Sequence, residues 1–219
     1  MADEELGPLP AGRHGFSREH VSHNQRERLI ASLATAVAEK GYRTVTITDI
    51  TKHARVSRRV FYANFEGKDE CFLAAFEVVV EHVHELATEA LAGVGEWPEK
   101  AVATARAALV FFAEEPDLAR LCLVESQAAG PVVAARFHEA VHELVPYLEQ
   151  GRCQRQAERE LPPTTEESTI GALVMLASRK VGAGEAEQLR DLLPEFTEFI
   201  LAPYLGAERA GEMARLQAA

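Results

Sequence analysis

Hydrophobic residues recur at intervals of three and four along most of this chain, which is the spacing of one face of an α-helix. Ile30, Leu33 and Val37 follow this rule, and similar stripes run through residues 72–90 and 170–181. The alternation in twos that marks a β-strand is nowhere sustained. The pattern therefore predicts an all-α fold of about nine helices.

Glycine and proline divide the pattern into elements. Gly41 ends the first long helix, and Pro146 lies inside a later helical stripe, where it should produce a kink. Residues 151–163 are polar and end in two prolines, so we expect a loop there. The predicted division is a flexible arm at 1–21, a three-helix domain at 22–66, a helical bundle at 67–206 and a tail at 207–219.

Two short helices joined by a tight turn are predicted between residues 46 and 65. Thr46 with Asp49 has the spacing of a capping box for the first helix, and Ser57 can cap the second. Arg58 and Arg59 stand at the start of that second helix. This is the layout of a helix-turn-helix, whose second helix enters the DNA major groove, where arginine is the commonest reader of guanine.

The net charge of −11 argues at first against a nucleic-acid partner, but the charges are unevenly distributed. Residues 12–70 hold 11 Lys/Arg and 7 Asp/Glu, whereas residues 71–219 hold 12 and 24. A basic front on an acidic body is expected of a DNA-binding domain attached to another domain, although chance clustering gives the same split.

The sequence lacks the signatures of membrane, secreted and zinc-binding proteins and of common enzymes. No apolar run reaches the roughly 18 residues that span a bilayer, and the polar, acidic start does not predict a signal peptide. Three separated cysteines form no zinc spacing, and no phosphate-binding glycine loop or nucleophile elbow is found. We expect a cytoplasmic protein with no catalytic residues, metal, cofactor or membrane association.

The helix-turn-helix region resembles the N-terminal signature of the TetR-like transcriptional regulators, the tetracycline-repressor family. The matching positions are Gly41, Tyr42, Thr46, Asp49, Ile50, Ala54, Val56, Ser57, Tyr62, Phe65 and Lys68. The resemblance implies a regulator, most often a repressor, that binds a pseudo-palindromic double-stranded DNA operator as a homodimer. It also implies a small-molecule effector that binds the bundle and releases the DNA.

Roles on DNA are carried over from the resemblance one position at a time. It implies DNA-binding roles for Thr46, Thr48, Ser57, Arg58, Arg59, Tyr62, Asn64 and Lys68. The chain departs from the family pattern at Asn64, at Ala63, and at Arg55, which stands where the family usually has glycine. A left-handed conformation at Arg55 costs about 1 kcal/mol; alternatively the position is tolerant and its side chain adds a phosphate contact.

A mainly apolar pocket is predicted inside the bundle, because several large side chains share the inward stripes with one carboxylate. The candidate ligand-binding residues are Phe76, Leu109, Phe112, Leu121, Glu125, Phe137 and Val141. Glu125 either reaches out from the edge of its stripe or lines a polar spot in the cavity, where it would orient a hydrophobic or weakly cationic effector.

The apolar content of residues 170–181 and 189–204 predicts a homodimer formed through the last two helices, with Leu173 and Phe196 as test positions. Two other functions stay open: a small helical enzyme using His138, His142 and Glu125, and a purely structural bundle. Activity that depends on those three residues would favour the enzyme, and failure to bind any DNA would favour the structural bundle.

Overall fold

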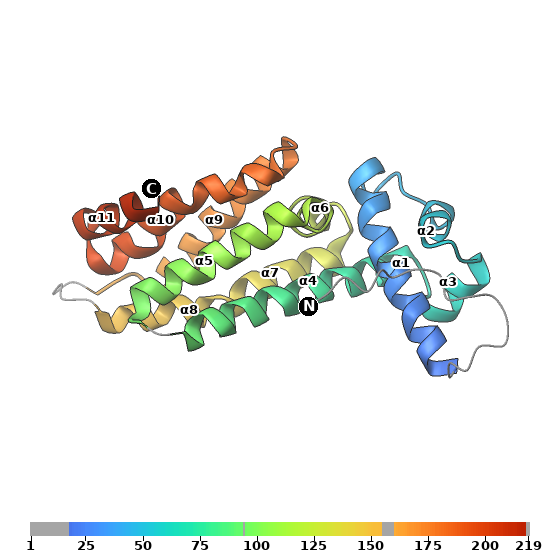
Figure 1. Cartoon of the computed structure of the whole chain (residues 1–219), viewed down its shortest axis with the longest axis horizontal. Coiled ribbons are helices and arrows are strands. Elements are labelled where there is room, and N and C mark those ends of the chain that lie inside the picture. The colour runs from blue at the N-terminus through green and yellow to red at the C-terminus, as the bar shows by residue number, and fades with distance from the viewer. Residues whose placement is uncertain (1–17, 94, 155–159, 218–219) are drawn as a thin grey trace.

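The computed structural model describes residues 18–93, 95–154 and 160–217, and within these ranges the chain is helical and contains no strand. The predicted all-α class is confirmed (Figure 1). The α-helices are α1 (Arg18–Lys40), α2 (Ile47–Ala54), α3 (Arg58–Asn64), α4 (Lys68–Ala92), α5 (Trp97–Glu114), α6 (Pro116–Leu123), α7 (Pro131–Glu143), α8 (Val145–Glu149), α9 (Thr165–Gly182), α10 (Leu193–Leu205) and α11 (Ala207–Gln217). Short 3-10 segments are η1 (Glu125–Gln127), η2 (Gln150–Gln154) and η3 (Ala186–Leu192).

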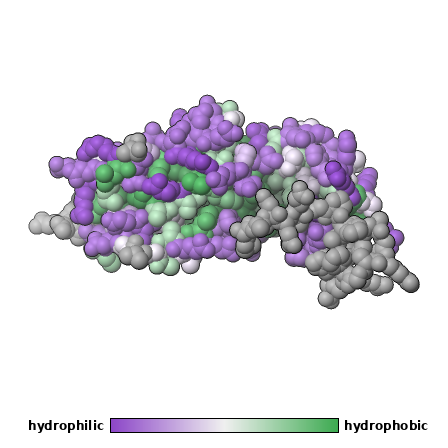
Figure 2. Space-filling view, in the orientation of Figure 1, coloured by the Kyte–Doolittle hydropathy of each residue, from purple (hydrophilic) through white to green (hydrophobic). Residues whose placement is uncertain are grey.

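The molecule is elongated, with α1, α2 and α3 at one end and the remaining helices in a bundle (Figure 1). Helix α4 begins beside the three-helix end and runs along the bundle, and both α4 and α6 contact α1. A band of hydrophobic residues lies along the middle of the bundle between hydrophilic margins (Figure 2). None of the described helices has the length and apolar composition needed to cross a membrane.

The three-helix end has its own hydrophobic centre. Leu29, Leu33 and Val37 of α1 are fully buried against Ile50 of α2 and Phe61 of α3. Leu33 and Val37 belong to the predicted stripe, whereas Leu29 is an additional buried position, so the local pattern positions α2 and α3 on α1.

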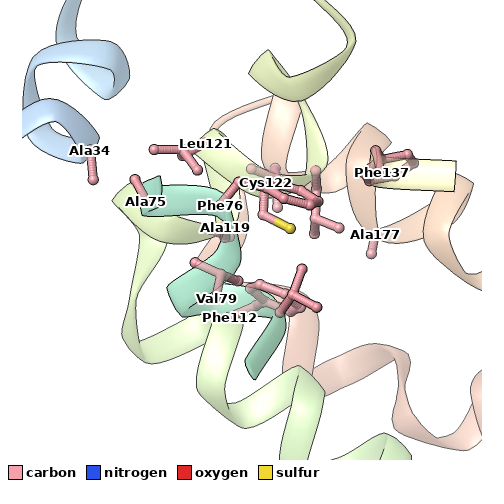
Figure 3. Packing of buried hydrophobic residues seen from close by; sticks show 14 of the residues in the cluster. Ala34, Ala75, Phe76, Val79, Phe112, Ala119, Leu121, Cys122, Phe137 and Ala177 are labelled. Carbon is pink, nitrogen blue, oxygen red and sulfur yellow. The ribbon is translucent and has the colours of Figure 1, made fainter. Parts of the chain in front are cut away.

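The two ends of the molecule share one continuous core. Ala34 of α1 lies near Ala75 of α4 and Leu121 of α6, and the packing continues through Phe76 to Phe137 (Figure 3). The ring centroids of Phe76 and Phe137 are 6.2 Å apart. The three-helix end is therefore packed directly onto the bundle, with only residues 65–67 between α3 and α4.

The helix count exceeds the predicted nine for two physical reasons. Pro146 interrupts the predicted seventh helix, and the chain breaks there into α7 and α8. The segment 207–219, expected to be a tail, is helical over 207–217 as α11 and packs on α10. Gly206, at φ 84°, makes the turn between them, and the buried face of α11 consists of Ala210 and Ala214, which give only a weak hydrophobic signal.

Candidate nucleic-acid interface and effector cavity

The turn between α2 and α3 is made by Arg55, which has φ 51° and ψ 45°. This is the left-handed conformation, so the departure from glycine carries the expected strain of about 1 kcal/mol. The amide of Arg55 donates to the carbonyl of Lys52 at 3.2 Å, and the amide of Val56 donates to that of Thr51 at 3.1 Å. The Arg55 side chain is exposed, which leaves its guanidinium on the surface of the three-helix end.

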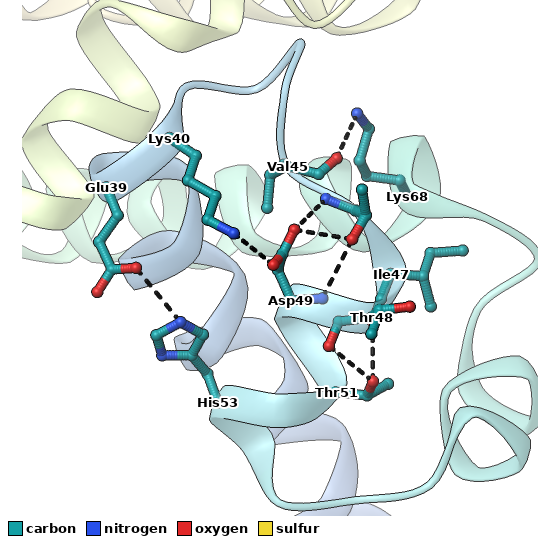
Figure 4. A network of polar contacts seen from close by, with 10 residues as sticks. Glu39, Lys40, Val45, Ile47, Thr48, Asp49, Thr51, His53 and Lys68 are labelled. Carbon is teal, nitrogen blue, oxygen red and sulfur yellow. Dashed lines mark hydrogen bonds and ion pairs between the residues drawn. The ribbon is translucent and has the colours of Figure 1, made fainter.

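The start of α2 is fixed by the predicted capping box. The Thr46 hydroxyl accepts from the amide of Asp49 at 3.2 Å, and the Asp49 carboxylate accepts from the amide of Thr46 at 2.9 Å (Figure 4). Lys40 of α1 also donates to this carboxylate. The hydrogen bonds from Lys40 and Thr46 hold the pKa of Asp49 well below its usual range.

The outward face of α3 carries the candidate base readers. The hydroxyl of Ser57 accepts from the amide of Val60 at 3.3 Å and so caps the helix. Arg58 and Arg59 are exposed in the first turn, and Tyr62 is 53% exposed. The guanidinium of Arg58 lies 3.4 Å from the Tyr62 hydroxyl. A short capped helix therefore presents two arginines and a tyrosine together to solvent.

The other expected DNA contacts are placed in different ways. Thr46 and Thr48 are exposed, near the start of α2. The Asn64 amide nitrogen donates to the carbonyl of Val60 at 2.8 Å, within its own helix. Lys68 donates to the carbonyl of Val45 at 3.0 Å (Figure 4). It also donates to the carbonyl of Tyr42 at 2.7 Å, and so holds the loop between α1 and α2.

Several arginines and lysines of this end lie outside the predicted set of DNA contacts. Arg43 and Lys52 are exposed, as is Arg55, for which a phosphate contact is already considered above, and the charges of Arg43 and Lys52 alone could have suggested them. Arg28 is buried and donates to the carbonyl of Ala54, at the end of α2. Burial lowers the pKa of Arg28.

A mainly apolar cavity of about 160 Å³ lies inside the bundle. Helices α4, α5, α9 and α10 supply most of its wall, for example Val83, Ala105, Ile170 and Phe196. The wall also includes Leu123 at the end of α6 and Tyr147 of α8. A cavity of this composition is typical of a site for an apolar small molecule.

Two of the expected pocket residues line this cavity, namely Leu109 and Phe112. Phe76, Leu121 and Phe137 are instead buried in the closed packing near α1 and α6 (Figure 3). Val141 is partly buried against the core but is not part of the cavity wall. The residues of α9 and α10 that line this wall were instead expected at the dimer interface. A hydrophobic stripe on a helix shows that this face is buried, but it does not show whether the face packs inside the bundle or against a second copy of the chain.

Glu125 has neither of the two roles considered from the sequence. It is 8% exposed in η1, and its carboxylate accepts from the amide of Tyr42 at 2.9 Å. Arg120 pairs with the same carboxylate at 3.1 Å. Gly41 lies against it with φ 76°, and a Cβ there would be 3.6 Å from both carboxylate oxygens. Glu125 thus joins the bundle to the loop that precedes α2.

A chain of polar groups adjoins the cavity at Tyr147. The Tyr147 hydroxyl lies 3.2 Å from Nδ1 of His84, and Nε2 of His84 lies 3.0 Å from the carboxylate of Glu143. Arg136 bridges Glu143 and Glu77, at 3.0 and 2.7 Å. No spacing in the sequence indicates these contacts, because the residues come from three separate helices, α4, α7 and α8.

The histidines and carboxylate considered for an enzyme do not make a reactive site. His138 and His142 are exposed on α7, whereas Glu125 is occupied by Tyr42 and Arg120. Within the part of the chain that the structure describes, no three metal-binding side chains cluster.

The outer faces of α9 and α10 each carry one large exposed apolar side chain among polar neighbours. Met175 is 71% exposed and Phe199 is 52% exposed. A groove between the two helices is lined by Ala172, Phe199 and Pro203, among others. Leu173 and Phe196 point the other way, into the cavity wall, and are buried. Exposed apolar faces of this kind are typical of protein–protein contacts.

Together, the capped helices and the left-handed turn define a helix-turn-helix protein with an attached helical bundle. Residues 29–75 match the model of the bacterial regulatory proteins of the tetR family. This N-terminal region is therefore similar to the DNA-binding domain of that family, as the resemblance predicts. No curated protein matches the sequence significantly.

Solved structures share the fold over most of the chain at low sequence identity. The fatty acid degradation regulator FadR from Bacillus halodurans is 18% identical with a TM-score of 0.71, over 80% of this chain and 97% of its own. FadR from Bacillus subtilis, in complex with stearoyl-CoA, is 17% identical with a TM-score of 0.69, over 82% and 98%. A gamma-butyrolactone receptor described as ArpA-like is 19% identical with a TM-score of 0.65, over 90% and 95%.

Proposed function

We propose that this protein is a cytoplasmic, sequence-specific transcriptional regulator, most simply a repressor that a small molecule releases from its operator. The observation that carries the proposal is the outward face of α3, where Arg58, Arg59 and Tyr62 are exposed together on a capped helix that follows a tight turn. The match of residues 29–75 to a family of DNA-binding domains supports the same conclusion.

On DNA, Arg58 and Arg59 read base edges in the major groove, because each guanidinium can donate two parallel hydrogen bonds to guanine. Tyr62, Thr46 and Thr48 contact the phosphate backbone. Ser57 and Asn64 contribute through their positions on α3, although their side chains also bond to the backbone of that helix. Lys68 acts chiefly by holding the loop before α2, and its remaining N–H can reach a phosphate.

Residues 22–66 form the DNA-binding domain in this proposal, and residues 67–206 bind the effector and dimerise. The exposed apolar faces of α9 and α10 form a homodimer around a two-fold axis, with α11 beside them. Such a dimer presents two copies of α3 to two half-sites, so the operator is pseudo-palindromic.

The effector is a hydrophobic small molecule that binds the cavity in the bundle. Support comes from the apolar wall of the cavity and from structural relatives described as a complex with stearoyl-CoA and as a gamma-butyrolactone receptor. To release DNA, the effector must bind the conformer with low DNA affinity more tightly than the other, and the coupling is reciprocal.

The experiment is selection of genomic fragments bound by the purified protein, followed by sequencing. We expect one enriched motif with two inverted half-sites about one helical turn apart. The matched control is the double variant Arg58→Ala/Arg59→Ala, which should enrich no motif while staying folded. A wild-type protein that enriches no sequence at low salt would refute the proposed function.

A further inference from the structure

We propose that the cavity selects a compact, uncharged ligand that carries one hydroxyl group, an alcohol or a phenol, and binds that group at Tyr147. The inference deepens the proposed function, on which it rests, by naming the chemical class of the effector. It is argued from the wall of the cavity, from its size and from the hydrogen bonds of Tyr147.

The wall excludes a charge. Among the described residues that line the cavity there is no Lys, Arg, His, Asp or Glu, and the only polar side chains are Thr104 and Tyr147. A carboxylate or ammonium group placed there would lose its hydration and gain no ion pair, which is strongly unfavourable. The weakly cationic effector expected from Glu125 is therefore not part of the proposal, because Glu125 lies outside the cavity wall.

The size of the cavity sets the bulk of the ligand. A dry apolar cavity of about 150 Å³ accommodates benzene in another protein. This cavity, at about 160 Å³, therefore matches one six-membered ring with a small substituent, or a short alkyl chain. The cavity is partly open to solvent, so a long acyl chain with a large charged head would have to leave most of its length outside the apolar wall.

The hydrogen bonds among Tyr147, His84 and Glu143, beside the cavity, determine whether the ligand has to donate or accept a hydrogen bond. Nε2 of His84 faces the Glu143 carboxylate, which is paired with Arg136 and can only accept, so this nitrogen carries the proton. We infer that His84 is the neutral imidazole with its proton on Nε2, and in this tautomer Nδ1 accepts from the Tyr147 hydroxyl. The Tyr147 oxygen keeps free lone pairs, which accept a hydrogen bond from a ligand hydroxyl.

Thr104 is the other hydroxyl of the wall, and it provides a matched control. Its hydroxyl donates to the carbonyl of Lys100 at 3.0 Å, one turn earlier in α5. This local bond belongs to the helix and is not linked to the chain of His84 and Glu143. The Thr104 oxygen also keeps lone pairs, so Thr104 is the competing acceptor among the described residues of the wall. We assign the specificity to Tyr147, and the two variants below distinguish the two hydroxyls.

The test uses isothermal titration of the full chain without DNA, with three probes at pH 7.5. 4-Ethylphenol and 4-methylanisole are isomers that differ in the hydroxyl donor, and 4-methylbenzoate carries a charge. We expect 4-ethylphenol to bind roughly two- to tenfold more tightly than 4-methylanisole, since one hydrogen bond distinguishes them. 4-Methylbenzoate should bind at least about tenfold more weakly than 4-ethylphenol.

Three variants assign the effect to the cavity. Tyr147→Phe should abolish the preference for the phenol over the ether, while Thr104→Val should preserve it. Ala105→Phe, which fills the cavity, should weaken both neutral probes. Circular dichroism and thermal unfolding identify any variant that fails to fold, and in that case the wild-type ranking of the three probes still decides the proposal.

The proposal is overturned if 4-methylbenzoate binds as tightly as 4-ethylphenol, if no neutral probe binds the folded protein, or if Tyr147→Phe keeps the full preference. Genomic fragment selection separates these failures from failure of the proposed function. A protein that enriches a DNA motif but binds no neutral probe refutes the ligand class alone. A protein that binds 4-ethylphenol but enriches no DNA refutes the regulator.

Discussion

Arg58 and Arg59 lie side by side in the first turn of α3, yet their surroundings differ from those of Lys68 a few residues later. Both arginines are exposed, whereas the Lys68 ammonium donates to the carbonyls of Tyr42 and Val45. These surroundings indicate two roles. The exposed guanidinium groups of Arg58 and Arg59 are available for a base edge, whereas the Lys68 ammonium, which is bound to the loop, positions the domain.

We expect Arg58→Ala and Arg59→Ala each to cost about 1–3 kcal/mol of specific binding and to relax the preference at one base pair. Lys68→Met should weaken binding to all operator variants alike and also lower the melting temperature, because it frees the loop before α2. Fluorescence anisotropy with single-base operator variants measures the changes in binding, and thermal unfolding measures the change in melting temperature. Arg209→Ala, on α11, is the matched control and should change neither. Uniform losses in all three variants would contradict base reading.

At this scale the sequence predicted what depends on near neighbours. Thr46, Asp49 and Ser57 cap their helices as expected, because a cap involves residues three positions apart. The contacts of Glu125 and Lys68 could not be predicted in the same way. Their partners are 83 and 26 residues away at Tyr42, and no local spacing reports such a distance.

Helix α2 has its stability concentrated at its first turn, since it is only eight residues long. Thr46→Ala removes the hydroxyl cap and should lower the free energy of unfolding by about 1 kcal/mol, measured by urea denaturation. Thr44→Ala, at an exposed position before the helix, is the control and should have a much smaller effect.

The stabilisation by this turn should also depend on pH. The pKa of Asp49 is lower in the folded protein than its ordinary value of 3.8, so the contribution is complete above that value and is lost as the pH falls through the folded pKa. The difference between wild type and Thr46→Ala should therefore be constant from pH 7 to pH 5 and shrink below pH 4. A difference that grows on acidification would contradict the role of the capping box.

The proposed dimer interface and the cavity lie on opposite faces of α9 and α10. We expect Met175→Asp and Phe199→Asp to give monomers in sedimentation equilibrium and to bind the operator poorly, because each places a charge on an exposed apolar face. Val132→Asp is the control, because Val132 is similarly exposed but lies on α7, and this variant should remain dimeric. A wild-type monomer at micromolar concentration would remove this interface.

The same two helices show what periodicity cannot decide. Leu173 and Phe196 were expected to test the dimer, but they are buried in the cavity wall, so their substitution would report on the cavity. The spacing correctly predicts that α9 and α10 have apolar faces. It does not distinguish an inner face from an outer one, since both consist of apolar residues three and four positions apart.

Across the whole molecule, one short path connects the cavity to the DNA-binding end. Leu123 at the end of α6 lines the cavity, and Glu125 lies two residues later. Glu125 accepts from the amide of Tyr42, and Lys68 and Glu125 hold the same loop from two sides. A ligand that displaces Leu123 and shifts η1 with it would therefore either pull on the loop before α2 or break the bond between Glu125 and Tyr42.

We expect Glu125→Gln to uncouple the two sites without removing either. Glutamine keeps the shape but weakens the pairing with Arg120 and the bond from Tyr42, which is charge-assisted in the native protein. The affinity for 4-ethylphenol should stay within about twofold, since Glu125 does not line the cavity. The loss of operator affinity caused by the ligand should fall at least about threefold, which corresponds to part of a typical coupling free energy.

Gln127→Ala, at an exposed position of the same segment, is the control and should keep the full coupling. Operator binding measured with and without saturating ligand gives the coupling for each variant. An unchanged ratio in Glu125→Gln would show that the signal travels through α4 or the dimer interface instead.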